Sequence, residues 1–272
     1  MRLKPKLILT NLSLALMLVI SPIAQSKLLP KPATNASQLA ANRYDSSNDI
    51  FHPVYGKNGM VASEQGLATQ VGLDILKQGG NAIDAAVAVG FALAVVLPNA
   101  GNIGGGGFMV LHDDKTGKDV AIDFREIAPA KASRDMYLDS QGNVIDGKSL
   151  FTHDASGVPG TVAGMEYALK KWGTMPLSKV LEPAIKLADK GFIVSDVLAK
   201  TLKEEKSTLG KWSASKAIFI KNGEPMKSGD LLVQKDLAKS LRLIAKQGAK
   251  AFYQGEIATK IAKDMQSHGG TM

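Results

Sequence analysis

One stretch decides the fold: residues 79–114 read GGNAIDAAVAVGFALAVVLPNAGNIGGGGFMVLHDD. Asn81 is a favourable helix N-cap, and Asp84 falls in the first turn, where a carboxylate interacts well with the helix dipole. The residues from Ala82 to Leu97 are apolar on nearly every side and rich in alanine, and Pro98 ends the run. A helix of this kind has to be buried on most of its surface. We therefore predict a central helix that neighbouring elements approach closely.

A β-hairpin is predicted directly after the glycines. Residues 108–112 and 119–124 have the composition and alternation of strands, and the sequence DDKTG between them is suited to a turn. Alternate residues of a strand point to opposite faces. We expect Val120, Ile122 and Phe124 to face the core.

Helical periodicity covers much of the remaining chain. Apolar residues recur at three- and four-residue steps in 64–78, before the two glycines at 79–80. Further helices are predicted at 162–172, 177–190, 197–209, 234–247 and 255–268. The glycines after His268 are a plausible helix stop. The sequence thus predicts a mixed α/β (α+β) chain, with its strands early and mostly helices later.

The first 50 residues are expected to lie outside the folded domain. Residues 1–26 have a basic start, an apolar run and small residues before a cleavage point after Ser26, which is the pattern of a secretory signal peptide. A membrane anchor is the alternative, but the apolar run is short and interrupted by polar residues. Residues 27–50 are rich in Pro, Ala, Asn and Ser and are predicted to be a flexible lead-in. The domain itself is assigned to 51–272.

Composition excludes several classes of function. The chain has 272 residues and no cysteine, which rules out disulfides, thiol catalysis and cysteine-based zinc sites. Its net charge of +8 falls to +5 without the signal segment, and the lysines are scattered among acids. With only 6% aromatic residues, nucleic-acid binding is not predicted. An exported solute-binding protein is an alternative function that only the signal segment supports.

The glycine run at 104–107 invites comparison with a phosphate-binding loop. Such loops connect a strand to a helix, so that the helix N-terminus meets the anion. Here the order is helix, glycines, strand, and no Gly-Lys-Ser/Thr sequence is present. We expect the glycines to permit unusual backbone dihedrals or close packing beside the buried helix, at what could be a substrate edge.

Arg125 stands in the sequence DFRE, residues 123–126, at the end of the second predicted strand. An arginine beside a glycine-rich turn is suited to hold a carboxylate through two parallel hydrogen bonds. From the residues alone, an ion pair with Asp123 or Glu126 is the simpler explanation.

The spacing of residues along the sequence reveals no other catalytic or metal-binding motif. The histidines are not placed at metal-ligand spacings such as HExxH, and there is no Gly-x-Ser-x-Gly sequence. Thr152, Thr161 and Thr174 have no evident general base nearby in sequence. No cofactor and no metal are predicted.

Several motifs do carry a family resemblance when taken in order. They are MVAS at 60–63, GGNAIDAAVA at 79–88, NIGGGGFM at 102–109, DFRE at 123–126, AP at 128–129, GVPGTVAG at 157–164 and YAL at 167–169. Together they resemble the N-terminal part of the large subunit of the γ-glutamyltransferases, also called γ-glutamyltranspeptidases or glutathione hydrolases. The resemblance runs from about Phe51 to the last residue.

The resemblance implies a fold and a chemistry. The fold would be the N-terminal-nucleophile hydrolase αββα sandwich, with only its N-terminal portion present. Such enzymes cut themselves into a large and a small subunit, and the new N-terminal Thr of the small subunit attacks the γ-glutamyl bond of glutathione and related compounds. The γ-glutamyl group then passes to water or to an amino acid or peptide. The family's Asp-Phe-Arg-Glu arginine binds the substrate α-carboxylate, and this role would fall to Arg125.

One departure limits these expectations. The family's Thr-Thr-His-like nucleophile motif does not occur in these 272 residues. We therefore expect a truncated large-subunit segment, inactive alone and with a bare core face where the missing strands would pack. A non-catalytic, pseudogene-like fragment that retains only Arg125 is the alternative. A cephalosporin-acylase-like specificity is a further one, against which Arg125 argues. Binding to nucleic acid, or to a membrane after signal cleavage, is not expected, and the location would be periplasmic or secreted.

Overall fold

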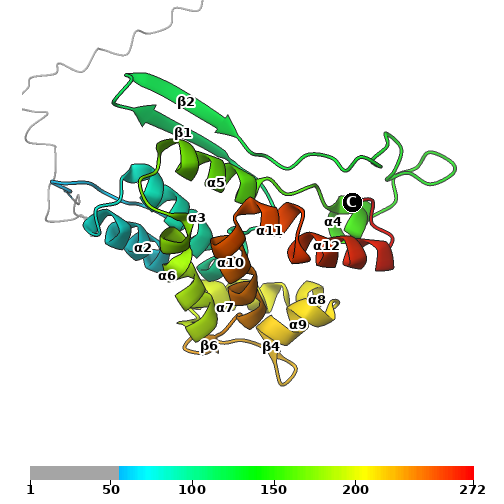
Figure 1. The fold of residues 1–272 in the computed structure, drawn as a ribbon. Helices are drawn as coiled ribbons and strands as arrows, with labels where there is room; N and C mark the ends of the chain where they lie inside the picture. The colour runs from blue at the N-terminus through cyan, green and yellow to red at the C-terminus, as the bar shows by residue number, and fades with distance from the viewer. Residues whose placement is uncertain (1–54) are drawn as a thin grey trace, which may run out of the picture. The chain divides into compact units, whose positions relative to one another are not determined.

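The fold is arranged around α3 (Ala82–Val96) in the computed structural model, which describes residues 55–272. Val87, Ala88, Ala92 and Val95 have no exposed surface. Three helices pack against α3: α2 (Gly66–Lys77), α5 (Thr161–Trp172) and α6 (Leu177–Lys190). The predicted central helix is therefore confirmed, with its first residue as predicted (Figure 1).

The N-terminus of α3 is closed by a capping box. The Asn81 side chain accepts hydrogen bonds from the backbone N–H groups of Ile83 and Asp84 at 2.9 and 3.0 Å, and Asp84 in turn accepts from the Asn81 N–H at 2.8 Å. This arrangement satisfies backbone donors that the first helical turn leaves without partners. The Asn81 side chain also donates to the carbonyl of Trp172 at 2.6 Å, which joins α3 to the end of α5.

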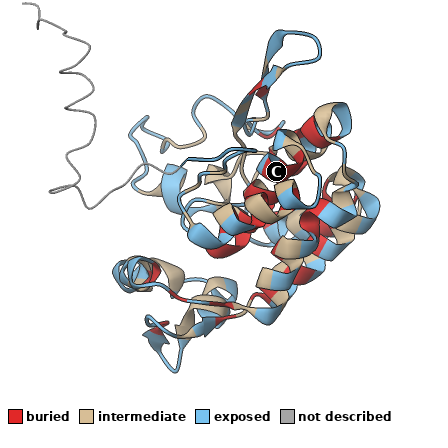
Figure 2. Ribbon diagram, turned by 90° about the vertical axis from the view of Figure 1, so that its left-hand side faces the viewer, coloured by how far each residue is buried: buried red, intermediate tan, exposed pale blue. Residues whose placement is uncertain are grey.

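The predicted hairpin is confirmed as β1 (Phe108–Asp113) and β2 (Lys118–Asp123), an antiparallel pair with Val110 opposite Ala121. The inward face carries Leu111 and Ile122, which are buried. The outward face is exposed although it carries apolar side chains, with Phe108 and Val110 at 65% and 79% exposure. Figure 2 shows the hairpin as a largely exposed part of the structure.

The second half of the described chain is mostly helical, as predicted. Its helices after α6 are α7 (Asp196–Glu204), α8 (Lys206–Leu209), α9 (Ser213–Phe219), α10 (Lys235–Gln247), α11 (Ala249–Tyr253) and α12 (Glu256–Ser267), and short helical turns α4 (Lys148–Phe151) and η1 (His153–Ala155) precede α5. Two short antiparallel pairs join β3 (Phe192–Ile193) to β6 (Leu231–Leu232) and β4 (Ile220–Lys221) to β5 (Glu224–Pro225). The described strands thus form two-stranded sheets only.

One predicted helix is wrong in its extent. The segment 197–209 was expected to be a single helix, but it is divided into α7 and α8 at Glu205, whose ψ of 10° departs from helical geometry. Leu198 and Leu202 are buried along α7, and Leu209 at the end of α8 packs against the same core. The helices and strands that the sequence did not predict are shorter than the window in which periodicity becomes visible.

The other predicted ends agree with the structure. The helix α12 stops at Ser267, followed by Gly269 in a left-handed conformation with φ of 72° and by a hydrogen bond of 2.8 Å from the Gly270 N–H to the Met265 carbonyl. In the described part of the chain no helix has both the length and the apolarity to cross a bilayer. The predicted signal segment 1–26 and lead-in 27–50 lie outside the described residues.

Candidate functional site

Three motif segments far apart in the sequence meet at the end of β2. Gly107 and Phe124 exchange backbone hydrogen bonds with N···O distances of 3.3 and 3.0 Å, which extends the hairpin by one pair. The Gly105 carbonyl accepts from the N–H groups of Gly160 and Thr161, at 2.7 and 3.0 Å, and so caps the start of α5. The glycine run, the segment after β2 and the start of α5 are therefore joined through their backbones.

Close backbone contacts account for the glycines at this junction. A Cβ atom on Gly106 would lie 2.5 Å from the Glu126 nitrogen and 2.7 Å from the Cα of Arg125, and one on Gly160 would overlap the Phe124 carbonyl oxygen. The glycines at 104–107 do not have positive φ. Of the two expectations for the run, the structure thus confirms close packing rather than unusual dihedrals.

Arg125 leaves this junction with its side chain exposed. Its backbone N–H donates to Oδ1 of Asp123 at 2.9 Å. Within residues 55–272, Arg134 and Arg242 each form an ion pair with an aspartate, whereas the Arg125 guanidinium pairs neither with Asp123 nor with Glu126. The ion pair favoured from the residues alone is therefore wrong. A guanidinium held at a defined backbone position and free of a carboxylate from the described chain can receive one from a ligand.

The threonines considered from the sequence have structural partners. The Thr152 hydroxyl donates to the Lys148 carbonyl. The Thr161 hydroxyl donates to Oδ1 of Asn102, and the Thr174 hydroxyl donates to Oδ2 of Asp84. The Asn102 contact, at 3.3 Å, adds a side-chain link between the glycine run and α5. Asn102 and Thr161 support the junction that presents Arg125, and the sequence did not single out this pair.

Asp84 is a fully buried carboxylate in the described chain. Burial by itself would raise its pKa, but hydrogen bonds from Thr174, Asn81 and Met175 outweigh that effect and hold the pKa below its usual range. A carboxylate stabilised in its charged form is a weak proton acceptor. Both of its oxygens accept hydrogen bonds inside the core, so Asp84 serves as a structural group that joins α3 to the segment after α5.

The histidines fall into two groups. His112 pairs with Asp119 at 2.8 Å on the hairpin. His153 and His268, far apart in sequence, come together with Asp264. His52 lies outside the described residues.

Comparison with known proteins gives the family. The family model of the gamma-glutamyltranspeptidases matches residues 68–272. The chain belongs to the gamma-glutamyltranspeptidase family. A curated relative, the glutathione hydrolase proenzyme of Escherichia coli (strain K12), is 61% identical over 228 residues, which are 84% of this chain and 39% of the relative. The glutathione hydrolase proenzyme of Pseudomonas sp. (strain A14) is 51% identical over 80% of this chain and 38% of its own length.

A solved structure agrees in fold. The crystal structure of Helicobacter pylori gamma-glutamyltranspeptidase superimposes with a TM-score of 0.79 at 53% identity, over 81% of this chain and 63% of that one. The predicted family and the mixed helix-and-strand part of the N-terminal-nucleophile hydrolase fold are thereby confirmed. The chain spans about two fifths of the length of the curated relatives.

Sequence reasoning found the Arg125 segment but missed the histidine cluster. Asp264 and His268 stand four residues apart on a predicted helix, a spacing that places two side chains on one face. That spacing was a usable signal. The third member, His153, is 111 residues from Asp264 and could be found only from the folded chain.

Proposed function

We propose that the protein containing this chain is a γ-glutamyltransferase and glutathione hydrolase. It would cleave the γ-glutamyl bond of glutathione and related compounds, and would pass the γ-glutamyl group to water or to an amino acid or peptide. The observation that carries the proposal is the exposed Arg125 side chain, unpaired within residues 55–272 and positioned by the meeting of three family motifs.

In this proposal Arg125 holds the α-carboxylate of the γ-glutamyl group by two parallel N–H···O bonds. Two features support that role. The Asp123 carboxylate accepts from the Arg125 backbone rather than from the guanidinium, so the side chain stays available. Because Gly106 has no Cβ, the glycine run packs directly against the Arg125 backbone. This contact holds the Cα atom from which the Arg125 side chain extends.

The bond-breaking step belongs to a segment outside these 272 residues. The family resemblance assigns it to an N-terminal threonine of the small subunit, whose α-amino group takes the hydroxyl proton as the oxygen attacks the γ-carbonyl carbon. The amine leaves with a proton, and water or an acceptor amine then attacks the acyl-enzyme. The names of the two curated relatives, both proenzymes, agree with a precursor that is processed.

The hairpin supports the presence of such a second part. Phe108 and Val110 are exposed on β1 in the described chain. Burying an apolar side chain of this size stabilises a protein by about 1.5–3 kcal/mol. We propose that the small subunit of the same precursor covers this face. We also propose that residues 1–26 direct export, which would place the mature protein in the periplasm or outside the cell.

The test compares Arg125→Ala and Arg125→Lys in the whole protein, using release of the amine from a γ-glutamyl anilide. Losing one partner of a hydrogen-bonded charge pair costs about 2–5 kcal/mol, so kcat/KM should fall by at least about 30-fold in Arg125→Ala. Arg125→Lys should recover part of this loss because it keeps the charge without the planar fork. Arg134→Ala is the matched control, since Arg134 is exposed and, among residues 55–272, pairs with its neighbour Asp135 alone.

A second substrate separates carboxylate binding from a general loss of activity. Wild-type enzyme should discriminate strongly against an anilide whose α-carboxylate is converted to an amide, and Arg125→Ala should discriminate little. Equal discrimination by both proteins would show that Arg125 does not bind the α-carboxylate. Amine release by purified residues 27–272 alone would contradict the placing of the nucleophile outside this chain.

A further inference from the structure

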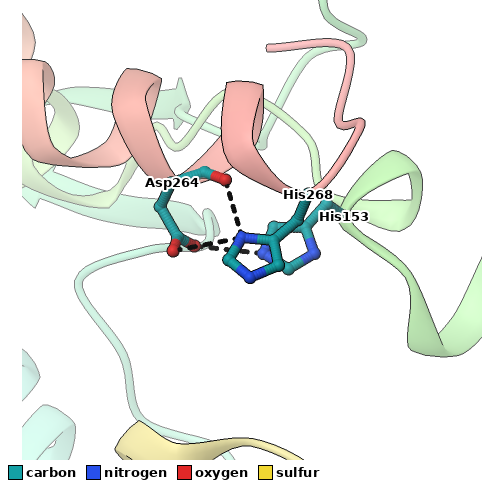
Figure 3. Close-up of side chains that lie close together, drawn as sticks. All are labelled: His153, Asp264 and His268. Carbon is teal, nitrogen blue, oxygen red and sulfur yellow. Dashed lines mark hydrogen bonds and ion pairs between the residues drawn. The ribbon is translucent and has the colours of Figure 1, made fainter.

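A cluster of two histidines and one carboxylate has no part in the proposed chemistry. His153 belongs to η1, while Asp264 lies in the last turn of α12 and His268 is the residue directly after that helix (Figure 3). Nε2 of His153 lies 3.0 Å from Oδ2 of Asp264, and Nδ1 of His268 lies 3.4 Å from Oδ1 of Asp264. Two imidazoles thus contact one carboxylate, and one of them comes from a segment 111 residues earlier in the chain.

The His153 contact is a hydrogen bond, and Nδ1 of His268 also lies 2.9 Å from the backbone carbonyl oxygen of Asp264, within hydrogen-bond distance. The same three side chains carry donor atoms of the kind that bind metal ions. Zn²⁺ binds His nitrogen and carboxylate oxygen at about 2.0–2.2 Å in tetrahedral geometry, which places neighbouring donor atoms roughly 3.3 Å apart. One donor atom from each of the three residues lies within 4.8 Å of the others, so a small movement of the side chains brings the donors to that spacing. Imidazole and carboxylate together suit Zn²⁺ and related divalent transition metals.

The surroundings leave room for the remaining coordination positions. The cluster opens onto a cavity of about 430 Å³, in which Phe151 and Trp212 provide apolar walls and Thr152 and Thr208 provide hydroxyl groups. His153 is the anchored member, because only 15% of its side chain is exposed, against 45% for His268 and 62% for Asp264. One fixed ligand and two adjustable ligands at a cavity mouth form an accessible site.

One rearrangement is needed. The two imidazole rings are stacked, with centroids 4.4 Å apart and planes inclined by 6°. An ion bound in the plane of one ring cannot lie in the plane of a parallel ring, so one ring has to turn. His268 is the ring that can do so, being more exposed and at the end of a helix. Trp212 meets both rings edge-on, at 5.2 and 6.0 Å, and would sense that movement.

We propose that His153, Asp264 and His268 form a binding site for a divalent transition-metal ion, with Zn²⁺ as the ion that fits the donors best. The ion would tie α12 to η1, and η1 is followed directly by the segment at 157–161 that supports Arg125. Its effect would be to stabilise this end of the fold, because a ligand that binds only the folded state shifts the unfolding equilibrium.

The test uses the whole protein without a histidine tag, stripped with a chelator and then titrated with Zn²⁺ alone. We expect one Zn²⁺ per protein by calorimetry and elemental analysis, and an unfolding midpoint that rises by a few degrees with saturating Zn²⁺. Asp264→Asn and His268→Gln should each weaken binding at least tenfold. His112→Gln is the matched control, since His112 and Asp119 form a similar pair at 2.8 Å with no third donor from the described chain.

A spectroscopic measurement guards against loss by misfolding. The fluorescence of Trp212 is obtained as the difference between the wild type and a Trp212→Phe variant. Cu²⁺ should quench this fluorescence only when His153 and His268 are both present. Circular dichroism of each variant confirms that it is folded. Zn²⁺ binding of equal strength and stoichiometry in Asp264→Asn, His268→Gln and wild type would overturn the proposal, as would failure of the folded wild type to retain Zn²⁺.

Discussion

Replacing Asp84 should reveal how one buried carboxylate joins two parts of the fold. Oδ1 accepts from the backbone N–H groups of Thr174 and Met175 at 2.9 and 3.0 Å, and Oδ2 accepts from the Thr174 hydroxyl at 2.6 Å and from the Asn81 N–H at 2.8 Å. Asp84 is fully buried, so water cannot replace the carboxylate without a change in packing. The side chain closes the N-terminus of α3 and holds the chain that leaves α5.

The magnitude follows from these four bonds. An unsatisfied buried donor costs about 1–3 kcal/mol, and partial relaxation around a smaller side chain recovers some of that cost. We expect Asp84→Ala to lower the free energy of unfolding by about 3–5 kcal/mol, at the upper end of what single substitutions do. Asp84→Asn should lower the free energy of unfolding by nearly as much. The asparagine NH₂ group would replace one of the two accepting oxygens and would then face hydrogen-bond donors.

The assay is denaturation of the whole protein, combined with hydrogen exchange of the segments that contain Asn81, Thr174 and Met175. Their amide protons should exchange markedly faster in both variants. Asp196→Asn is the control: Asp196 stands in the first turn of α7 but is exposed, so its replacement should change stability by less than about 0.5 kcal/mol.

The same carboxylate predicts a dependence on pH. Its pKa in the folded protein lies below the ordinary value of 3.8 because Thr174, Asn81 and Met175 donate to it despite its burial. The stability that it contributes is therefore complete above about pH 4 and is lost as the pH falls through the lower, folded-state pKa. The Asp84→Asn variant should lack this acid-dependent contribution to the free energy of unfolding. Wild-type stability and amide protection in that variant would refute the reasoning.

Two further changes test the core and the junction. Leu181→Ala, at a fully buried position of α6, should lower the free energy of unfolding by about 2–5 kcal/mol in chemical denaturation, and a loss below 1 kcal/mol would mean that α6 does not pack as described. Gly106→Ala should lower kcat/KM for a γ-glutamyl anilide by displacing the backbone of Arg125, whereas Gly104→Ala, with open space at its Cβ, should not. Equal activity of the two glycine variants would contradict the role given to the close contact.

The sequence alone determined the local elements and the family. The capping residues and apolar run located α3, turn residues between alternating strands located β1 and β2, and the order of the motifs identified the family that the comparisons confirmed. These features are local because a helix or a hairpin is set by residues a few positions apart. Arg125 was also found locally, by its motif.

Tertiary structure decided the contacts between distant segments. Only the folded chain shows that Gly105 caps α5 and that Arg125 makes no ion pair within residues 55–272. Only the folded chain brings His153 to Asp264 and shows that the segment 197–209 is divided at Glu205. Periodicity records which face of an element is buried, but not which residues from another element bury it. That choice depends on packing of the whole core, which no single segment encodes.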